Sequence, residues 1–195
     1  MRVAERSRLT VAEYLAWERL QTCKHEYFEG EVYAMAGGSP RHNRLCVRVS
    51  AALDGAVGAT CAVLSSDQRV RTSERRYEYP DVTVVCGSLT IEHDDVLANP
   101  TMIVEVLSAS TEQYDRGLKW AGYQSLPSLT DYLLIAQDRA HVEHFARTPA
   151  SRWLYSSLGT GQTIVLTTGA TLEIDALFAG VLELPGDDQQ SSPSS

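Results

Sequence analysis

The sequence predicts a mixed α/β (α+β) fold with a central mixed β-sheet flanked by helices, and with an additional N-terminal helix and hairpin. Helical and strand-like segments follow one another as helix, hairpin, helix, several strands, helix and further strands. The predicted strand 101–107 is largely apolar, which is typical of a strand covered on both faces, and 131–136 is predicted as a further strand. The absence of GxGxxG and GxxxxGK[ST] argues against a Rossmann or P-loop nucleotide-binding fold.

The first elements have clear boundary signals. Thr10-Val11-Ala12-Glu13 is a capping box, which predicts a helix to about residue 20. Glu29-Gly30 separates strands at 25–28 and 32–35, and it predicts a tight hairpin turn. Ser39-Pro40 then predicts the start of a second helix that reaches about residue 57.

Strands dominate the rest of the chain. The pattern predicts them near 60–64, 68–72, 78–86 and 101–107, and later at 131–136, 141–147, 153–157, 163–166 and 171–174. Between these two groups, Ser110-Thr111-Glu112-Gln113 has the form of another capping box and predicts a helix to about residue 125, before Pro127.

Length and composition predict one soluble domain. The chain has 195 residues and 44% hydrophobic content, which suits a single core over residues 1–185, and residues 186–195 are expected to form a disordered tail. No signal peptide and no apolar run of about 18 residues is found, so we expect a cytoplasmic protein without membrane association. The cysteines form no CxxC pair and are expected to be buried free thiols: Cys23, Cys46, Cys61 and Cys86.

The formal net charge of −8 does not support nucleic-acid binding, which normally uses clustered basic residues. The net charge does not exclude a nucleic acid as a substrate. Two groups of arginines favour solvated, exposed side chains, with a local basic rim as the alternative. They are Arg41, Arg44 and Arg48 in the second helix, and Arg69, Arg71, Arg75 and Arg76 further on.

Two acidic residues occur in segments that otherwise look like core strands. Glu105 interrupts the apolar strand 101–107, and Asp81 follows Pro80 at the start of another strand. A buried carboxylate needs a cation, a metal, a hydrogen-bond donor or an adjacent cleft. If the strands are neighbours, both carboxylates can converge on a hard divalent cation such as Mg²⁺.

The helix after Glu105 contains Lys119, one of only two lysines in the chain, four residues after Asp115. Its ammonium group can point back over the Glu105 strand and orient a water or offset phosphate charge. Alternatively, Asp115 and Lys119 form an ordinary surface ion pair, and spacing alone leaves both interpretations open.

These residues resemble a known nuclease pattern. Pro80-Asp81, then Glu105-Val106-Leu107-Ser108-Ala109-Ser110, then the segment from Asp115 to Tyr123 resemble the PD-(D/E)XK nuclease superfamily. Within it, the chain resembles the bacterial Uma family of restriction-endonuclease-like proteins, from the first helix to about Leu184.

The resemblance implies a restriction-endonuclease-like fold and a site for Mg²⁺, or alternatively Mn²⁺. Asp81 and Glu105 would be metal ligands, and the main-chain carbonyl of Val106 would be a third contact. Leu107 occupies the position where the superfamily has a lysine. Lys119 matches the position to which the Uma family moves that lysine. The resemblance also implies a homodimer, for which the late strands are the favoured surface.

Several weaker candidates remain. Glu26 is either an additional metal or water contact or a solvated strand residue, and the same alternatives apply to Glu31. For His42 the sequence favours a surface or hydrogen-bonded side chain over one facing the cleft. His141 and His144, three apart on a strand, should face opposite ways and not share a metal. Trp120 and Tyr123 are expected in the core, although Tyr123 can also line the cleft.

The sequence therefore predicts a Mg²⁺-dependent endonuclease that hydrolyses DNA or RNA phosphodiester bonds with a metal-activated water, using Asp81, Glu105 and Lys119. One alternative is a catalytically inactive nuclease-like scaffold for protein interaction or oligomerisation, which the negative charge and Leu107 favour. Another is the hydrolysis of a small phosphate ester.

Overall fold

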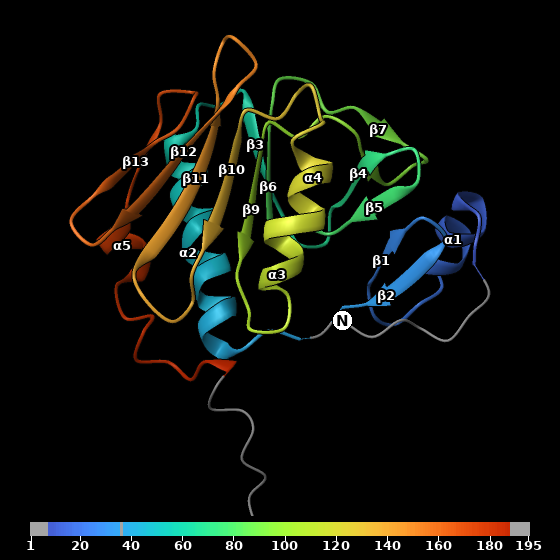
Figure 1. Ribbon diagram of the computed structural model, residues 1–195, viewed down its shortest axis with the longest axis horizontal. Helices are drawn as coiled ribbons and strands as arrows, with labels where there is room; N and C mark the ends of the chain where they lie inside the picture. The colour runs from blue at the N-terminus through green and yellow to red at the C-terminus, as the bar shows by residue number, and fades with distance from the viewer. Residues whose placement is uncertain (1–7, 36, 188–195) are drawn as a thin grey trace, which may run out of the picture.

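The computed structural model describes residues 8–35 and 37–187, and it has a central mixed sheet with helices on both faces (Figure 1). The strand order is β12-β11-β10-β9-β6-β3, with β9 and β10 parallel and the other neighbours antiparallel. These strands are β3 (Cys61–Ser65), β6 (Val82–Cys86), β9 (Met102–Val106), β10 (Asp131–Ile135), β11 (His141–Arg147) and β12 (Trp153–Gly159). This arrangement confirms the predicted fold class.

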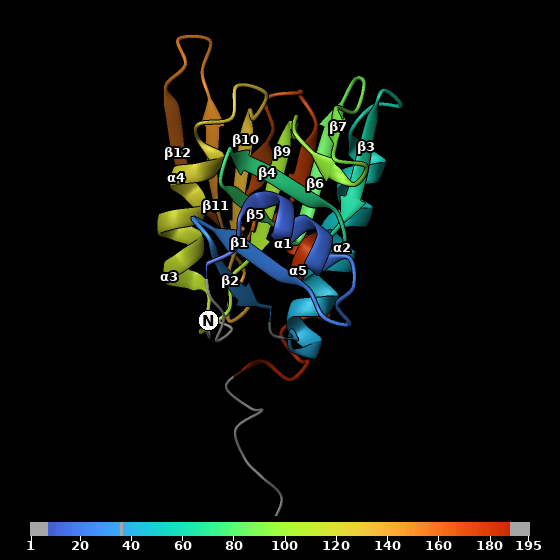
Figure 2. The same cartoon turned by 90° about the vertical axis from the view of Figure 1, so that its right-hand side faces the viewer.

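Helices cover the two faces of the central sheet. Figure 2 shows α2 (Pro40–Ala56) on one side and the segment α3 (Glu112–Tyr114), η1 (Asp115–Lys119) and α4 (Trp120–Tyr123) on the other. On the α2 side, α5 (Ile174–Phe178) and the hairpin β13 (Thr163–Val165) and β14 (Thr171–Glu173) complete a large apolar cluster. On the opposite side, Ile103 and Tyr132 pack against Tyr123 in a second cluster. β9 is therefore buried on both faces, as its apolar sequence predicts.

A second six-stranded sheet has the order β2-β1-β5-β4-β8-β7; it lies beside the central sheet in Figure 1 and in front of it in Figure 2. Its strands are β1 (His25–Phe28), β2 (Glu31–Ala34), β4 (Arg69–Ser73), β5 (Arg76–Glu78), β7 (Ile91–Glu92) and β8 (Val96–Leu97). Helix α1 (Val11–Glu18) packs on this sheet, where the rings of Tyr14 and Tyr27 stack with centroids 4.8 Å apart. The predicted N-terminal helix and hairpin thus belong to a larger layer.

The boundary signals of the first elements are confirmed. Thr10 and Glu13 form the predicted capping box. Glu29 and Gly30 both have positive φ, 50° and 96°, as a tight two-residue hairpin turn requires. Helix α2 begins at Pro40, with the Ser39 side chain accepting a hydrogen bond from the His42 amide.

Other predicted boundaries are wrong. The expected strand 78–86 is divided at Tyr79-Pro80, so that β5 and β6 belong to different sheets, because proline cannot donate a ladder hydrogen bond. The expected capping box at 110–113 does not form, since Thr111 is the N-cap and makes no side-chain cap bond. The short elements β7, β8 and α5 were not predicted.

The prediction of four buried free thiols is also wrong. Cys61 and Cys86 form a disulfide, because the antiparallel register of β3 and β6 places them opposite each other. Cys23 is exposed, and Cys46 is a partly buried free thiol.

The favoured interpretation of the arginines as exposed is correct for Arg44 and Arg75 but wrong for three others. Arg41, Arg69 and Arg76 are buried. Arg41 donates to the main-chain carbonyls of residues 137, 182 and 184. These guanidinium groups hold the structure together internally and do not form a basic rim.

Two expectations concern the outside of the molecule. Within the described ranges, no helix has both the length and the apolar character needed to cross a bilayer. In the predicted tail, Asp187 accepts a hydrogen bond from Gln137, and 188–195 lie outside the described residues. β12 is an edge strand of the central sheet, and the dimer through the late strands stays a prediction.

Candidate functional site

A pocket of about 560 Å³ lies where the two sheets meet beneath the α3–η1 segment. Its lining includes four of the residues predicted from sequence, Glu26, Asp81, Glu105 and Lys119, and also Val106. Each comes from a different part of the fold: β1, the β5–β6 connection, β9 and η1. The structure therefore brings the predicted site residues together.

Asp81 owes its position to the break at Pro80. The chain leaves the second sheet after β5 and joins the central sheet at β6, and Asp81 lies at this crossing. β6 runs antiparallel to β9, with Val82 opposite Val104. The amide of Val106 donates a hydrogen bond of 2.7 Å to Asp81 Oδ2, which anchors this carboxylate next to the end of β9.

Lys119 is buried among three carboxylates and is not part of a surface pair. Its Nζ lies 3.0 Å from Glu105 Oε1, 3.1 Å from Glu26 Oε1 and 3.3 Å from Asp115 Oδ1. A π-helical turn contributes to this placement, because the Trp120 amide bonds to the Asp115 carbonyl, five residues back. Of the two interpretations left open by the sequence, the structure supports the one in which Lys119 points back over the Glu105 strand.

The charge state of Lys119 limits its chemistry. Burial disfavours the ammonium form, but the negative charges of Glu105, Glu26 and Asp115 outweigh burial and raise the pKa of Lys119 well above its usual range. Lys119 is therefore an ammonium ion at neutral pH. It can donate hydrogen bonds and stabilise negative charge, but it cannot act as a general base.

Glu105 accepts hydrogen bonds through one of its two oxygens. Lys119 Nζ and the Tyr123 hydroxyl both donate to Oε1, at 3.0 and 2.8 Å. Burial raises the pKa of Glu105 well above its usual range, against the opposing effect of Lys119. Tyr123 lies in the core, as predicted, and it orients Glu105 from there.

Glu78 is a site residue that the sequence analysis missed. It is fully buried at the end of β5, its nearest ion-pair partner is Arg76 at 3.8 Å, and neither of its oxygens has a hydrogen-bond partner among the described residues. Burial, followed by the charge of Glu26, raises the pKa of Glu78 to about 8. An acid between Tyr77 and Tyr79, two residues before Pro80, is a signal that could have identified it.

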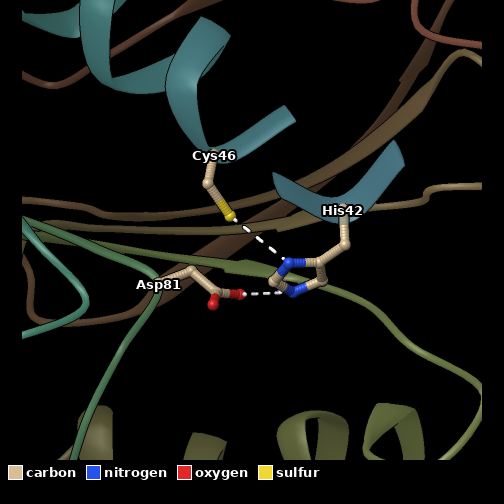
Figure 3. A group of neighbouring side chains, drawn as sticks. All are labelled: His42, Cys46 and Asp81. Atoms are coloured by element: carbon tan, nitrogen blue, oxygen red, sulfur yellow. Dashed lines mark hydrogen bonds and ion pairs between the residues drawn. The ribbon is translucent and has the colours of Figure 1, made fainter. Parts of the chain in front are cut away.

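His42 is a hydrogen-bonded side chain, as the favoured interpretation from sequence has it, but it also borders the pocket. Its Nε2 is 3.3 Å from Asp81 Oδ2, and its Nδ1 is 3.6 Å from the Cys46 Sγ (Figure 3). Burial disfavours the imidazolium, but the hydrogen bonds and charges of Asp81 and Cys46 outweigh it and raise the pKa of His42 to about 11.

The remaining candidates lie elsewhere. Glu31 lies on the hairpin, where it accepts a hydrogen bond from the Tyr33 hydroxyl and forms an ion pair with Arg8. His141 and His144 have separate partners, Ser157 at 2.9 Å and Asp131 at 2.8 Å, which agrees with opposite faces. Leu107 and Trp120 contribute to the apolar cluster on the α4 side of the sheet.

The donor set fits a hard divalent cation. Asp81 Oδ1 and Glu105 Oε2 have no hydrogen-bond partner among the residues described, whereas the other oxygen of each carboxylate, Asp81 Oδ2 and Glu105 Oε1, accepts hydrogen bonds. Three acids, Glu26, Glu105 and Asp115, lie within 3.3 Å of the Lys119 ammonium, and Asp81 borders the same pocket. Such an excess of buried acid over base favours the binding of a cation.

Sequence comparisons identify relatives over most of the chain. The model of the Uma2 family, described as "Putative restriction endonuclease", matches residues 11–181. "Uncharacterized protein slr1290" from Synechocystis sp. (strain ATCC 27184 / PCC 6803 / Kazusa) is 34% identical over 177 residues, covering 89% of this chain and 93% of that protein. "Uncharacterized protein sll1609" from the same organism is 37% identical over 162 residues, covering 81% of this chain and 92% of that protein.

A solved structure shares the fold. It is described as a putative nuclease belonging to DUF820 from Anabaena variabilis ATCC 29413, and it superposes with a TM-score of 0.71 at 17% identity, covering 89% of this chain and 99% of that chain. This likeness supports the fold, and the family match confirms the resemblance that Pro80-Asp81, Glu105 and Lys119 predict. The chain therefore belongs to the Uma2 family.

Proposed function

We propose that the protein is a nuclease that hydrolyses phosphodiester bonds of DNA or RNA with Mg²⁺ as its cofactor. The observation that carries the proposal is the burial of Glu26, Glu105 and Asp115 around Lys119, beside Asp81, in one pocket. A structural ion pair needs one acid for one base, whereas this arrangement leaves an excess of carboxylates on the pocket wall. Membership of a restriction-endonuclease family agrees with that chemistry.

Each side chain has a role that follows from its surroundings. Asp81 and Glu105 would hold the ion, with the Val106 carbonyl as a further oxygen at the end of β9. A bound Mg²⁺ supplies Lewis acidity, lowering the pKa of a water and neutralising charge on the scissile phosphate. Lys119 stays charged, so it orients the attacking water and stabilises negative charge in the transition state. Tyr123 positions Glu105 by its hydrogen bond.

The test compares Asp81→Asn and Glu105→Gln with the parent protein on duplex DNA, single-stranded DNA and RNA, in Mg²⁺ and in Mn²⁺. Both substitutions keep shape and remove charge. We expect each to reduce the cleavage rate at least about 100-fold, a loss typical of groups that stabilise transition-state charge. Circular dichroism and thermal unfolding check that the variants are folded.

Glu31→Gln is the matched control, because it removes an acid from the hairpin outside the pocket. It should cleave like the parent. Equal cleavage by all four proteins would contradict the proposal. If the parent neither cleaves nor binds Mg²⁺ or Mn²⁺ by calorimetry, the protein is an inactive scaffold.

A further inference from the structure

A second group of potential metal ligands lies at the pocket wall, next to the carboxylates described above. His42 and Cys46 are four residues apart in α2, so both side chains project from the same face of the helix. Asp81 faces them from the β5–β6 crossing (Figure 3). Among the described residues, this is the set of at least three His, Cys, Asp or Glu side chains whose ligand atoms all lie within 4.8 Å of one another.

The distances suit a small tetrahedral ion. The separations are 3.6 Å between Cys46 Sγ and His42 Nδ1, and 3.3 Å between His42 Nε2 and Asp81 Oδ2. Ligands at about 2.0–2.3 Å from zinc lie roughly 3.3–3.8 Å apart. The three ligand atoms, one from each residue, lie within 4.8 Å of one another, so the pair that is farthest apart closes by at most about 1 Å when an ion binds. The ion binds only one nitrogen of the His42 ring. The metal–ligand bonds then replace the hydrogen bonds that join His42 to Cys46 and Asp81.

The ligand types select the metal. A thiolate and an imidazole are ligands for Zn²⁺ and similar transition-metal ions, whereas Mg²⁺ binds oxygen ligands. His42 and Asp81 border the pocket, so a fourth coordination position can open toward it. Asp81 therefore belongs to both ligand groups, as an oxygen ligand in each.

Gly38 makes room for the histidine. A Cβ atom at this position would lie 2.7 Å from His42 Nδ1, whereas one at Gly37 would meet nothing within 4 Å. Both glycines border the pocket. The loop before α2 thus leaves the imidazole free to lie between Cys46 and Asp81, and the two glycines form a matched pair for substitution.

We propose that His42, Cys46 and Asp81 form a Zn²⁺ site, and that Zn²⁺ bound there takes Asp81 away from the catalytic cation and inhibits the enzyme. The inhibition rests on the proposed nuclease function, but the zinc site itself does not. Binding displaces the protons of His42 and Cys46, so the affinity is lower than that of a preformed zinc site.

Cobalt spectroscopy tests the site without any activity measurement. Cys23→Ser removes the exposed thiol, so Cys46 becomes the single free cysteine, which a thiol titration verifies. Added Co²⁺ should give a thiolate-to-cobalt charge-transfer band in the near ultraviolet, and Zn²⁺ should displace it at one ion per chain. Absence of the band would overturn the proposal.

Variants locate the ion. In the Cys23→Ser background, Cys46→Ser should abolish the band, and His42→Asn and Asp81→Asn should each weaken Zn²⁺ binding at least about tenfold by calorimetry. Gly38→Ala should also weaken it, while Gly37→Ala should not. Unchanged affinity in both His42→Asn and Asp81→Asn would show that Cys46 binds cobalt without them, and the proposed site would be wrong. Thermal unfolding checks that each variant is folded.

The inhibitory part has its own readout. If the parent protein cleaves nucleic acid in Mg²⁺, Zn²⁺ should lower its rate, and the ratio of rates with and without Zn²⁺ should move toward one in Cys46→Ser. An identical ratio in parent and variant would overturn the inhibition. If no protein cleaves, the nuclease function fails, whereas the cobalt band still decides whether the zinc site exists.

Discussion

Lys119 is the residue on which the electrostatics of the pocket depend, because its ammonium group lies within 3.3 Å of oxygens from three carboxylates. Lys119→Gln would leave these buried acids without their cation. We expect the free energy of unfolding to fall by about 3–5 kcal/mol, the usual effect of breaking a buried ion pair. Urea denaturation measures the change.

A second substitution separates stability from chemistry. Adding Asp115→Asn to Lys119→Gln removes one of the unpaired charges, so the double variant should recover part of the lost stability, since the two residues are in contact. Cleavage should not recover, because the ammonium is still missing. A double variant that regained both would show that Lys119 has a structural role only.

Glu78 should make stability depend on pH. The pKa of its carboxyl is raised to about 8 in the folded protein, from an ordinary value of 4.5. Between these values the folded protein keeps a proton that the unfolded chain loses, so the contribution of Glu78 to stability falls as pH rises from about 4.5 to about 8. Below this window both states are protonated, and above it both are ionised.

Glu78→Gln tests this effect, because the amide keeps the shape of the protonated acid. Relative to the parent, the variant should become progressively more stable between pH 5 and pH 8, as measured by denaturation at several pH values. Glu31→Gln serves as the control for an acid outside the pocket. A stability difference that stays flat across this range would mean that Glu78 is ionised throughout.

At the scale of residues, sequence predicted which side chains meet but not how they are paired. Asp81 and Glu105 could be found because burying a carboxylate in an apolar strand costs free energy unless the group has a partner. Glu26 was left open, since a four-residue strand gives no sign of which face is buried. His42 was undervalued, because its partners Asp81 and Cys46 come from separate segments and a lone histidine is usually unremarkable.

The π-helical turn and the glycine after it determine how closely the helical segment approaches the second sheet. A Cβ atom at Gly122 would lie 2.8 Å from Arg76 Nη1 and 3.2 Å from both Arg76 Cδ and Thr72 Oγ1. Arg76 also donates a hydrogen bond to the Leu118 carbonyl, which ties the segment to β5. Gly122 therefore allows the close contact that keeps Lys119 over the pocket.

Gly122→Ala should reduce the free energy of unfolding by about 1–3 kcal/mol, the usual effect of overpacking. Gly117→Ala is the matched control in the same segment, because a Cβ there would meet nothing within 4 Å. Alanine is favoured over glycine in helices, so this control should be neutral or slightly stabilising. Equal effects of the two substitutions in thermal unfolding would contradict the close contact at Gly122.

At the scale of elements, local signals predicted the helix starts and the hairpin well, since caps and turns depend on neighbouring residues. The division of 78–86 between two sheets depends instead on tertiary pairing, which Pro80 only suggested. The π turn at Asp115–Lys119 gave no sequence signal, because the helical pattern around it looks regular. The four-residue spacing between Asp115 and Lys119 would equally fit an exposed ion pair on a regular α-helix.

At the scale of the whole molecule, the Cys61–Cys86 disulfide joins the edge strand β3 to β6. It closes a loop with a sequence separation of 25, so Cys61→Ala combined with Cys86→Ala should lower the free energy of unfolding by about 3 kcal/mol. Chemical denaturation without reductant measures this loss. Cys23→Ala should have no comparable effect, and a double variant as stable as the parent would show that the bond does not form.

The four segments that supply Glu26, Asp81, Glu105 and Lys119 are spread over nearly half the chain, and β9 also needs β10, which ends at Ile135, beside it. No short fragment can contain the complete pocket. During synthesis the pocket is therefore incomplete until the core has folded. Limited proteolysis between the two sheets should abolish the proposed activity rather than release an active fragment. Such an arrangement confines the proposed cleavage reaction to the finished protein.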